Sequence, residues 1–197
     1  MIFFTFRPQR KVKKLNTLVP LMSLWPTINM NREPPIQMIK PQPGTYALIM
    51  YCRVKRRVEV GKLGSISLIP GYYIYVGSAF GPGGLRARVQ RHIRKSTKKY
   101  WHIDYIKWFT QPIEIWYSYD PVIREHQWAG IIKMSKNFRM LVKGFGSSDC
   151  SCAAHLFFMA ARPQAGMFIK KIQEDVKECD QIHVLKLEVL DNPCDNP

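Results

Sequence analysis

The sequence predicts an α+β fold in which a small antiparallel sheet is flanked by helices. Short runs of β-branched and aromatic residues, separated by glycine-containing turns, fill residues 44–77 and favour strands joined as an antiparallel meander. Residues 85–94 and 123–135 instead place their apolar side chains at helical spacing. An apolar fraction of 46% is enough for a buried core.

The same patterns define each element in turn. In chain order we expect strands at 45–52, 58–60, 65–69 and 72–76, helices at 85–94 and 101–108, a strand at 113–119, a helix at 123–135, a short buried element at 153–159, a helix at 167–179 and a strand at 181–190.

The chain divides into three parts. Residues 1–43 carry seven basic residues against one acidic residue, and prolines interrupt any period. We expect a disordered leader there, with a basic arm for nucleic acid as the alternative. Residues 44–160 form the expected folded domain, and residues 161–197 a helix–strand extension.

The charge is unusual. Thirty Lys and Arg residues against 14 Asp and Glu residues give a formal net charge of +16. Such an excess favours a polyanionic partner, nucleic acid first and an anionic membrane surface second. The alternative is a basic protein without such a partner.

Cysteine usage and hydropathy indicate the compartment. Five cysteines form no even set, and the apolar run 18–25 is broken by Pro20 and Ser23. That run is far shorter than the roughly 20 residues that span a bilayer, and it does not have the pattern of a secretory signal. We therefore expect a cytoplasmic protein that does not enter a membrane. The sequence indicates no oligomeric state.

The stretch Gly71–His92 combines a strand, a glycine-rich turn and a basic helix. Backbone N–H groups at a helix N-terminus and arginine side chains are the groups that hold phosphate. We expect the basic side chains of this helix and of the link after it to contact a nucleic-acid backbone: Arg86, Arg91, Arg94, Lys95, Lys98 and Lys99.

Several motifs resemble a known group of enzymes. Gly44-Thr-Tyr46, Tyr75-Val-Gly77 and Arg88 resemble the GIY-YIG nuclease superfamily. The longer blocks YVGSA, LRARVQRH, WHIDY and GFGSSDCSCAAHLFF are similar to its DUF123 branch, a small prokaryotic family of unassigned function that is sometimes fused to endonuclease III. The resemblance covers about residues 44–158.

The resemblance implies a fold and a chemistry. It implies about three central strands plus an inserted hairpin, and phosphodiester cleavage with one divalent ion, Mg²⁺ or Mn²⁺. Carried over by position, Tyr46 and Tyr75 are the paired tyrosines, Arg88 is the helix arginine and Glu125 is the metal ligand. The tyrosines are 29 positions apart, which is longer than is usual in the superfamily.

The chemistry of these residue types is consistent with that assignment. A carboxylate can hold Mg²⁺, and Arg88 offers two parallel donors to a phosphoryl group. Tyrosine, with a pKa near ~10, is a poor base. Tyr46 is therefore either a base with a lowered pKa or a residue that orients water, with Tyr75 as its partner.

His102 is a further candidate, as a second base or as the acid for the leaving group. Asp104 and His92 are weaker candidates for catalysis. A packed, hydrogen-bonded ring is the alternative role for His102.

The segment Cys150-x-Cys152-x-x-His155 invites a zinc interpretation, but its C-x-C spacing is tight and no fourth ligand is evident. The alternative is that this block lines a cleft with Ser147, Ser148 and Asp149.

The sequence therefore favours a metal-dependent endonuclease that hydrolyses DNA phosphodiester bonds, with a role in DNA repair. The alternatives are a non-catalytic nucleic-acid-binding module of the same fold, or an accessory to a base-excision enzyme.

Overall fold

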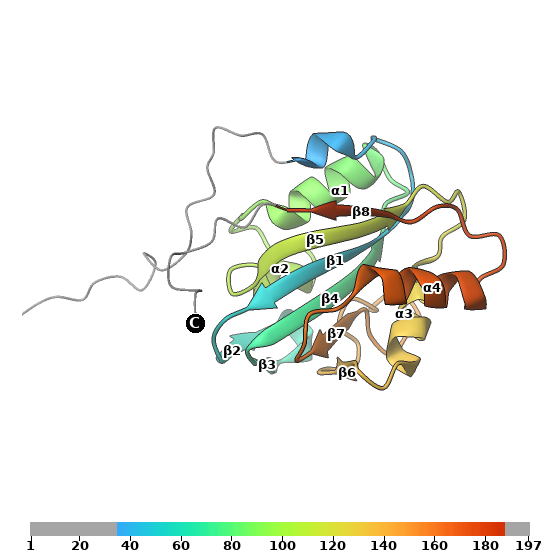
Figure 1. Cartoon of the computed structure of the whole chain (residues 1–197). Helices are drawn as coiled ribbons and strands as arrows, with labels where there is room; N and C mark the ends of the chain where they lie inside the picture. The colour runs from blue at the N-terminus through green and yellow to red at the C-terminus, as the bar shows by residue number, and fades with distance from the viewer. Residues whose placement is uncertain (1–34, 188–197) are drawn as a thin grey trace, which may run out of the picture.

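The computed structural model describes residues 35–187, which form an α+β fold with one large antiparallel sheet (Figure 1). The sheet has six strands, twice the expected three. In spatial order they are β6 (Arg139–Met140), β7 (Leu156–Met159), β4 (Gly71–Ser78), β1 (Thr45–Cys52), β5 (Gln111–Ser118) and β8 (His183–Lys186). Every neighbouring pair in this sheet is antiparallel.

The expected meander over residues 44–77 is wrong. β1 pairs with β4 along its whole length, from Thr45 opposite Ser78 to Cys52 opposite Gly71. β2 (Arg56–Glu59) and β3 (Ser65–Leu68) pair only with each other, in a separate two-stranded sheet. Burial explains this choice, because β1 and β4 are eight-residue strands that bury most of their side chains. β2 buries only Val58.

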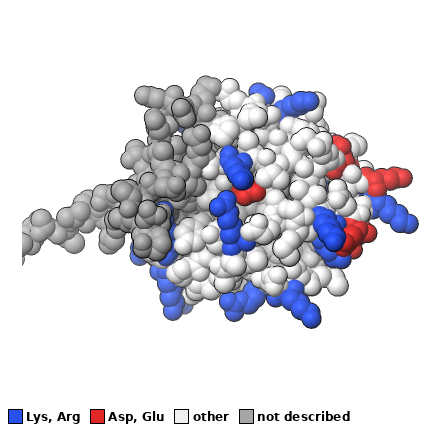
Figure 2. Space-filling model, viewed as in Figure 1, with Lys and Arg blue, Asp and Glu red and all other residues white. Residues whose placement is uncertain are grey.

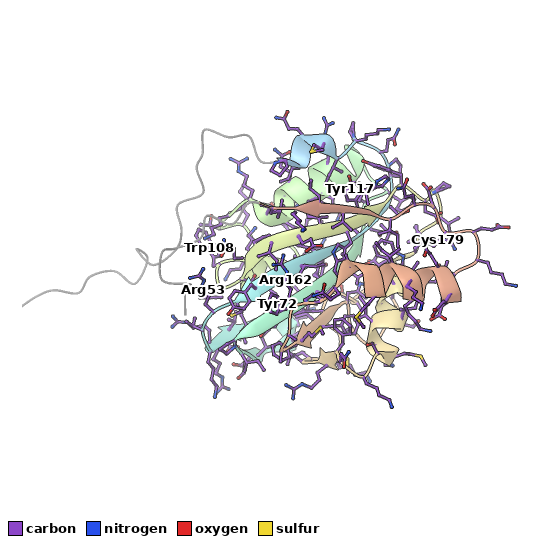
Figure 3. The ribbon with its side chains drawn as sticks, in the orientation of Figure 1. Arg53, Tyr72, Trp108, Tyr117, Arg162 and Cys179 are labelled. Carbon is purple, nitrogen blue, oxygen red and sulfur yellow. The ribbon has the colours of Figure 1, made fainter. Side chains whose placement is uncertain are left out.

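The two faces of the large sheet support two apolar clusters, as strand alternation requires. One face carries Tyr46, Tyr75 and Tyr117 and packs against the α1 side. The other face carries Ile74 and Trp116 and packs against α3 and α4. In Figure 1 α4 passes in front of the sheet while α1 and α2 lie behind it. Tyr72, which is labelled in Figure 3, packs against the cluster on the α4 side of the sheet.

The four α-helices lie where the helical spacing of apolar residues predicts them, but their ends differ from the predicted ones. Their bounds are α1 (Gly84–Ile93), α2 (Ile103–Ile106), α3 (Glu125–Met134) and α4 (Ala165–Asp175). α2 is much shorter than the expected 101–108. The hydroxyl of Thr110 donates to the carbonyl of Ile106 at 3.1 Å, and the Asp104 carboxylate accepts N–H groups from Tyr100 and Trp101. Side chains therefore bond the backbone groups on both sides of α2, so the helix does not need to extend to satisfy them.

The described structure includes nine residues before residue 44, where the domain was expected to start. A short 3₁₀ helix at Pro35–Met38 buries Ile36, and Ile39 follows it into the core. The guanidinium of Arg86 donates to the carbonyl of Ile39 at 2.6 Å, and Leu85 N–H donates to the carbonyl of Gln42 at 2.8 Å. Residues 35–43 therefore pack against α1. Residues 1–34 of the expected leader lie outside the described residues.

The helix and the strand of the expected extension both contact the large sheet or the helices that cover it. Phe168 and Ile172 of α4 are buried in the same cluster as Trp128 of α3, and the Trp128 and Phe168 rings lie 5.2 Å apart. β8 pairs with β5, which places it at one edge of the sheet (Figure 1). Residues 188–190 of the expected last strand are not among the described residues.

Within residues 35–187, no helix combines the length and the apolar character needed to cross a bilayer.

Candidate active site

A cavity of about 410 Å³ opens where six separate segments meet on the α1 side of the sheet. All five residues expected to take part in catalysis line it: Tyr46 of β1, Tyr75 of β4, Arg88 of α1, His102 just before α2, and Glu125 at the start of α3. The fold therefore brings together side chains spread over 80 positions of the sequence, from 46 to 125.

The two tyrosines are diagonal neighbours on one face of the sheet. Tyr46 lies opposite Gly77, and Tyr75 lies opposite Leu48, two residues along the same pair of strands. The hairpin that lengthens the interval leaves from the opposite end of β1, after Cys52, so it does not disturb this register. A Cβ at position 77 would lie 2.4 Å from the Tyr46 hydroxyl, so glycine is required beneath that ring.

Both phenols are held in their protonated form. Burial, followed by the neighbouring Tyr75, raises the pKa of Tyr46 well above its usual 10. Burial and Glu125 likewise raise the pKa of Tyr75, and Arg88 offsets only part of either shift. A low tyrosine pKa, which a base would need, is therefore absent from this arrangement, and both hydroxyls are hydrogen-bond donors at neutral pH.

α1 contributes Arg88 and His92, one turn apart. The guanidinium of Arg88 lies 4.5 Å from the centre of the Trp101 ring. His92 is 2% exposed and its ring lies 5.9 Å from that of Tyr46 and 5.7 Å from that of Tyr75. Burial lowers the pKa of His92 to about 3, so the ring is neutral. Among residues 35–187 its Nδ1 has no hydrogen-bond partner.

Glu125 is an ionised carboxylate with both oxygens oriented. The Ser78 hydroxyl donates to Oε2 at 2.5 Å, and His155 Nδ1 lies 2.8 Å from Oε1. Burial alone would raise the pKa of Glu125, but His155 and Ser78 outweigh it and leave the pKa lowered. The first turn of α3 adds a favourable helix dipole. Each oxygen keeps an unused lone pair, so the carboxylate can still bind a cation.

His102 is fixed by the loop that carries the GFGSSDC block. Gly146 N–H donates to His102 Nδ1 at 2.9 Å, so the neutral ring carries its hydrogen on Nε2. Burial lowers the pKa of His102 and favours that neutral form. Gly146, Ser148 and Asp149 of the same loop line the cavity, whereas the Ser147 side chain is buried away from it. Asp149 is the second carboxylate of the lining.

A second hollow, of about 690 Å³, adjoins the first and shares Tyr100 with it. Its charged lining is entirely basic, comprising Arg91, Arg94, Lys95, Lys98 and Lys107. We call this hollow the basic groove. Tyr100 and Trp108 supply its aromatic surface, and Tyr100 is 69% exposed. The α4 face, in contrast, carries both acidic and basic side chains (Figure 2).

Two residues of the expected phosphate-binding set lie outside the basic groove. Arg86 donates to the carbonyls of Ile39 and Gln37, which ties the N-terminal segment to α1. The ammonium of Lys99 lies over the Tyr105 ring, 4.7 Å from its centre. Asp104, a weak candidate for catalysis, is fully buried and bonds to Lys107 at 3.0 Å, which gives it a structural contact.

A cluster of sulfur and nitrogen atoms lies directly behind Glu125. It consists of His126, Cys150, Cys152 and His155. Burial and a hydrogen bond with Cys150 raise the pKa of the Cys152 thiol to about 11.

Sequence reasoning missed three participants. Ser78 lies inside the quoted YVGSA block, but nothing local linked its hydroxyl to Glu125. His126 follows Glu125 directly, yet only the packing of α3 against the 144–155 loop brings it to the two cysteines. Lys107 belongs to the expected 101–108 helix but to none of the predicted binding residues, and it is 4% exposed and lines the basic groove.

The fold and the cavity define a compact α+β domain with a tyrosine-, arginine- and glutamate-lined pocket beside a basic groove. The family model described as Domain of unknown function DUF123 matches residues 45–178, more than half of the chain. The protein belongs to the DUF123 family. The match includes α4 and so extends beyond residue 160, the expected end of the folded domain. No curated protein and no solved structure matches the chain.

Proposed function

We propose that the protein is a cytoplasmic, metal-dependent endonuclease that hydrolyses DNA phosphodiester bonds, with a GIY-YIG-like site. One observation carries the proposal. Two tyrosines, an arginine and an ionised glutamate, each carried over by position from the family resemblance, line a single cavity. These four side chains come from four different elements, so we do not expect chance packing to bring all of them to one cavity.

The lining suits a hard divalent ion. Glu125 and Asp149 are both carboxylates of the cavity, and Mg²⁺ or Mn²⁺ in phosphate-processing sites is held by one or two carboxylates and keeps several waters. When bound, such an ion would neutralise negative charge on the phosphoryl group and lower the pKa of a water molecule that it binds. The chain's own part is to hold Glu125 ionised and oriented through Ser78 and His155.

The other residues act on the phosphoryl group and the attacking water. Arg88 stabilises the charge that develops on the phosphoryl oxygens. Tyr46 and Tyr75, both protonated, orient the attacking water or a phosphate oxygen by donating hydrogen bonds. His102 donates from Nε2 because its Nδ1 is occupied by Gly146. The tyrosines are thus assigned an orienting role and not a basic one.

DNA is the proposed partner because of the basic groove. Four of its cationic side chains, Arg91, Arg94, Lys95 and Lys98, can contact successive phosphates without reading sequence, whereas Lys107 is buried against Asp104. Tyr100 can stack on an unpaired base. The overall charge of +16 acts in the same direction.

A second candidate function is a nucleic-acid-binding module without catalysis. It is favoured by the burial of Tyr46, which is 1% exposed, and by the raised pKa values of both tyrosines. In that case the groove binds DNA and the cavity holds a phosphate without cleaving it.

Cleavage assays on labelled DNA separate the two functions. Branched, abasic, single-stranded and duplex DNA are incubated with the full chain, with and without Mg²⁺ or Mn²⁺. The matched variants are Glu125→Gln and Glu174→Gln, the latter an exposed glutamate of α4. Cleavage that needs the metal and Glu125, but not Glu174, supports the endonuclease. Salt-sensitive binding with no cleavage of any substrate supports the module.

A further inference from the structure

We infer that His126, Cys150, Cys152 and His155 bind one zinc ion in a closed structural site. Their ligand atoms all lie within 4.8 Å of one another. His126 Nδ1 is 3.2 Å from Cys152 Sγ, and His155 Nε2 is 3.5 Å from Cys150 Sγ. Tetrahedral zinc with ordinary Zn–S and Zn–N bonds separates its ligand atoms by about 3.3–3.8 Å. The four side chains are therefore close to a zinc-binding arrangement.

The donor set selects the metal. Two sulfur and two nitrogen donors suit borderline-soft zinc, and they do not suit Mg²⁺, which prefers oxygen. Coordination releases both thiol protons to solvent, so two thiolates and two neutral imidazoles balance the charge of Zn²⁺. Four protein ligands leave no position open, which is the pattern of a structural site. This site is distinct from the one proposed for Mg²⁺ or Mn²⁺.

A second contact supports the assignment. His155 is 1% exposed, and while its Nε2 approaches Cys150, its Nδ1 lies 2.8 Å from Glu125 Oε1. Histidine ligands of zinc characteristically present their other ring nitrogen to a carboxylate, which fixes the tautomer and the ring orientation. Glu125 fills that place here.

The position of the cluster indicates what a bound zinc ion would do for the structure. His126 belongs to the first turn of α3, and the other three ligands follow the loop that holds Gly146 and Asp149. Joining them ties the start of α3 to the loop, and so fixes two walls of the cavity. The inference does not depend on the nuclease proposal, because zinc binding is measured without DNA.

Elemental analysis of the full chain, purified without chelators, tests the inference. We expect one zinc per chain, and cobalt substituted for it should show thiolate-to-cobalt charge-transfer absorption. Cys150→Ser should lose the metal, whereas Cys179→Ser, a free cysteine outside the cluster, should keep it. Less than a tenth of a zinc per chain, or equal loss in both variants, would overturn the site.

One variant avoids the risk of misfolding. His126 is exposed, so His126→Ala should fold normally, and competition with a chromogenic chelator should show zinc affinity lowered by more than about 100-fold. Unchanged affinity would refute a four-ligand site. A Cys150–Cys152 disulfide in the freshly purified chain, found by mass spectrometry without reductant, would assign the pair to redox chemistry and also overturn the inference.

Discussion

Tyr46 and Tyr75 show how single residues are positioned here. Their 29-residue separation is absorbed by the β2–β3 hairpin at the far end of β1 and β4, so the register at the cavity is unaffected. Burial then sets their chemistry, because it raises both pKa values. The sequence was enough to predict that these two residues lie close together, and both line one cavity. Their protonation state could not be predicted from the sequence, because it depends on desolvation by neighbours distant in the chain.

Replacing Tyr46 tests its orienting role. We expect Tyr46→Phe to slow cleavage by about 10²-fold. Because the raised pKa keeps the phenol protonated, the loss should be constant between about pH 6 and pH 9. Single-turnover rates measured across that range check this. A variant that cleaves as fast as wild type would show that Tyr46 has no role in cleavage. A pH–rate profile with an inflection in wild type that is missing from the variant would show that Tyr46 acts as a base.

His92 should make stability dependent on pH. Its folded pKa of about 3 lies below the unfolded value of about 6.5. Between these values the unfolded state binds more protons, so stability falls as the pH drops through that window, by at most about 1.4 kcal/mol per pH unit from this group. His92→Gln should lose less stability than wild type from about pH 6.5 to 4 in denaturant unfolding. Parallel losses in the two proteins would contradict a neutral, buried His92.

At the scale of elements, pairing was the part that sequence could not settle. The boundaries of β1 and α1 followed from apolar runs and period. The pairing of β1 with β4, and the edge strand β8, depended on which long apolar strands bury each other. Residues 35–43 have no helical or strand period because prolines interrupt the sequence, so the sequence did not predict structure there. Hydrogen bonds from Arg86 and Leu85 of α1 to the carbonyls of Ile39 and Gln42 hold this segment in place.

Gly77 links the sheet to the cavity. Gly77→Ala places a Cβ 2.4 Å from the Tyr46 hydroxyl, so the ring must move. We expect a loss of about 1–3 kcal/mol in the free energy of unfolding. Gly81→Ala is the matched control, because a Cβ there has no atom within 4 Å. Equal stability of the two variants in urea unfolding would mean that the Tyr46 ring is not held over Gly77.

At the scale of the whole molecule, the basic groove should govern binding and its salt dependence. We expect the double variant Arg94→Gln/Lys98→Gln to weaken binding to duplex DNA and to reduce the slope of log K against log salt by about 0.9 per lost phosphate contact. Fluorescence anisotropy from about 50 to 200 mM salt measures this slope.

The control changes the charge equally on the opposite face of the sheet. Lys170→Gln/Lys177→Gln removes two exposed lysines in and just after α4. If it weakens binding as much as the groove variant, the attraction comes from net charge and not from the groove.

The central claim is that the basic groove binds DNA and that the residues lining the adjoining cavity cleave it. The most direct test compares Arg88→Ala with Arg94→Ala in single-turnover cleavage at saturating protein, with Mg²⁺ or Mn²⁺. Arg88 lines the cavity and Arg94 only the groove. We predict that Arg88→Ala slows the cleavage step by about 10²–10³-fold while Arg94→Ala leaves the saturated rate unchanged. Equal rates for the two variants, or a wild-type protein that leaves every DNA substrate intact with either metal, would contradict the claim.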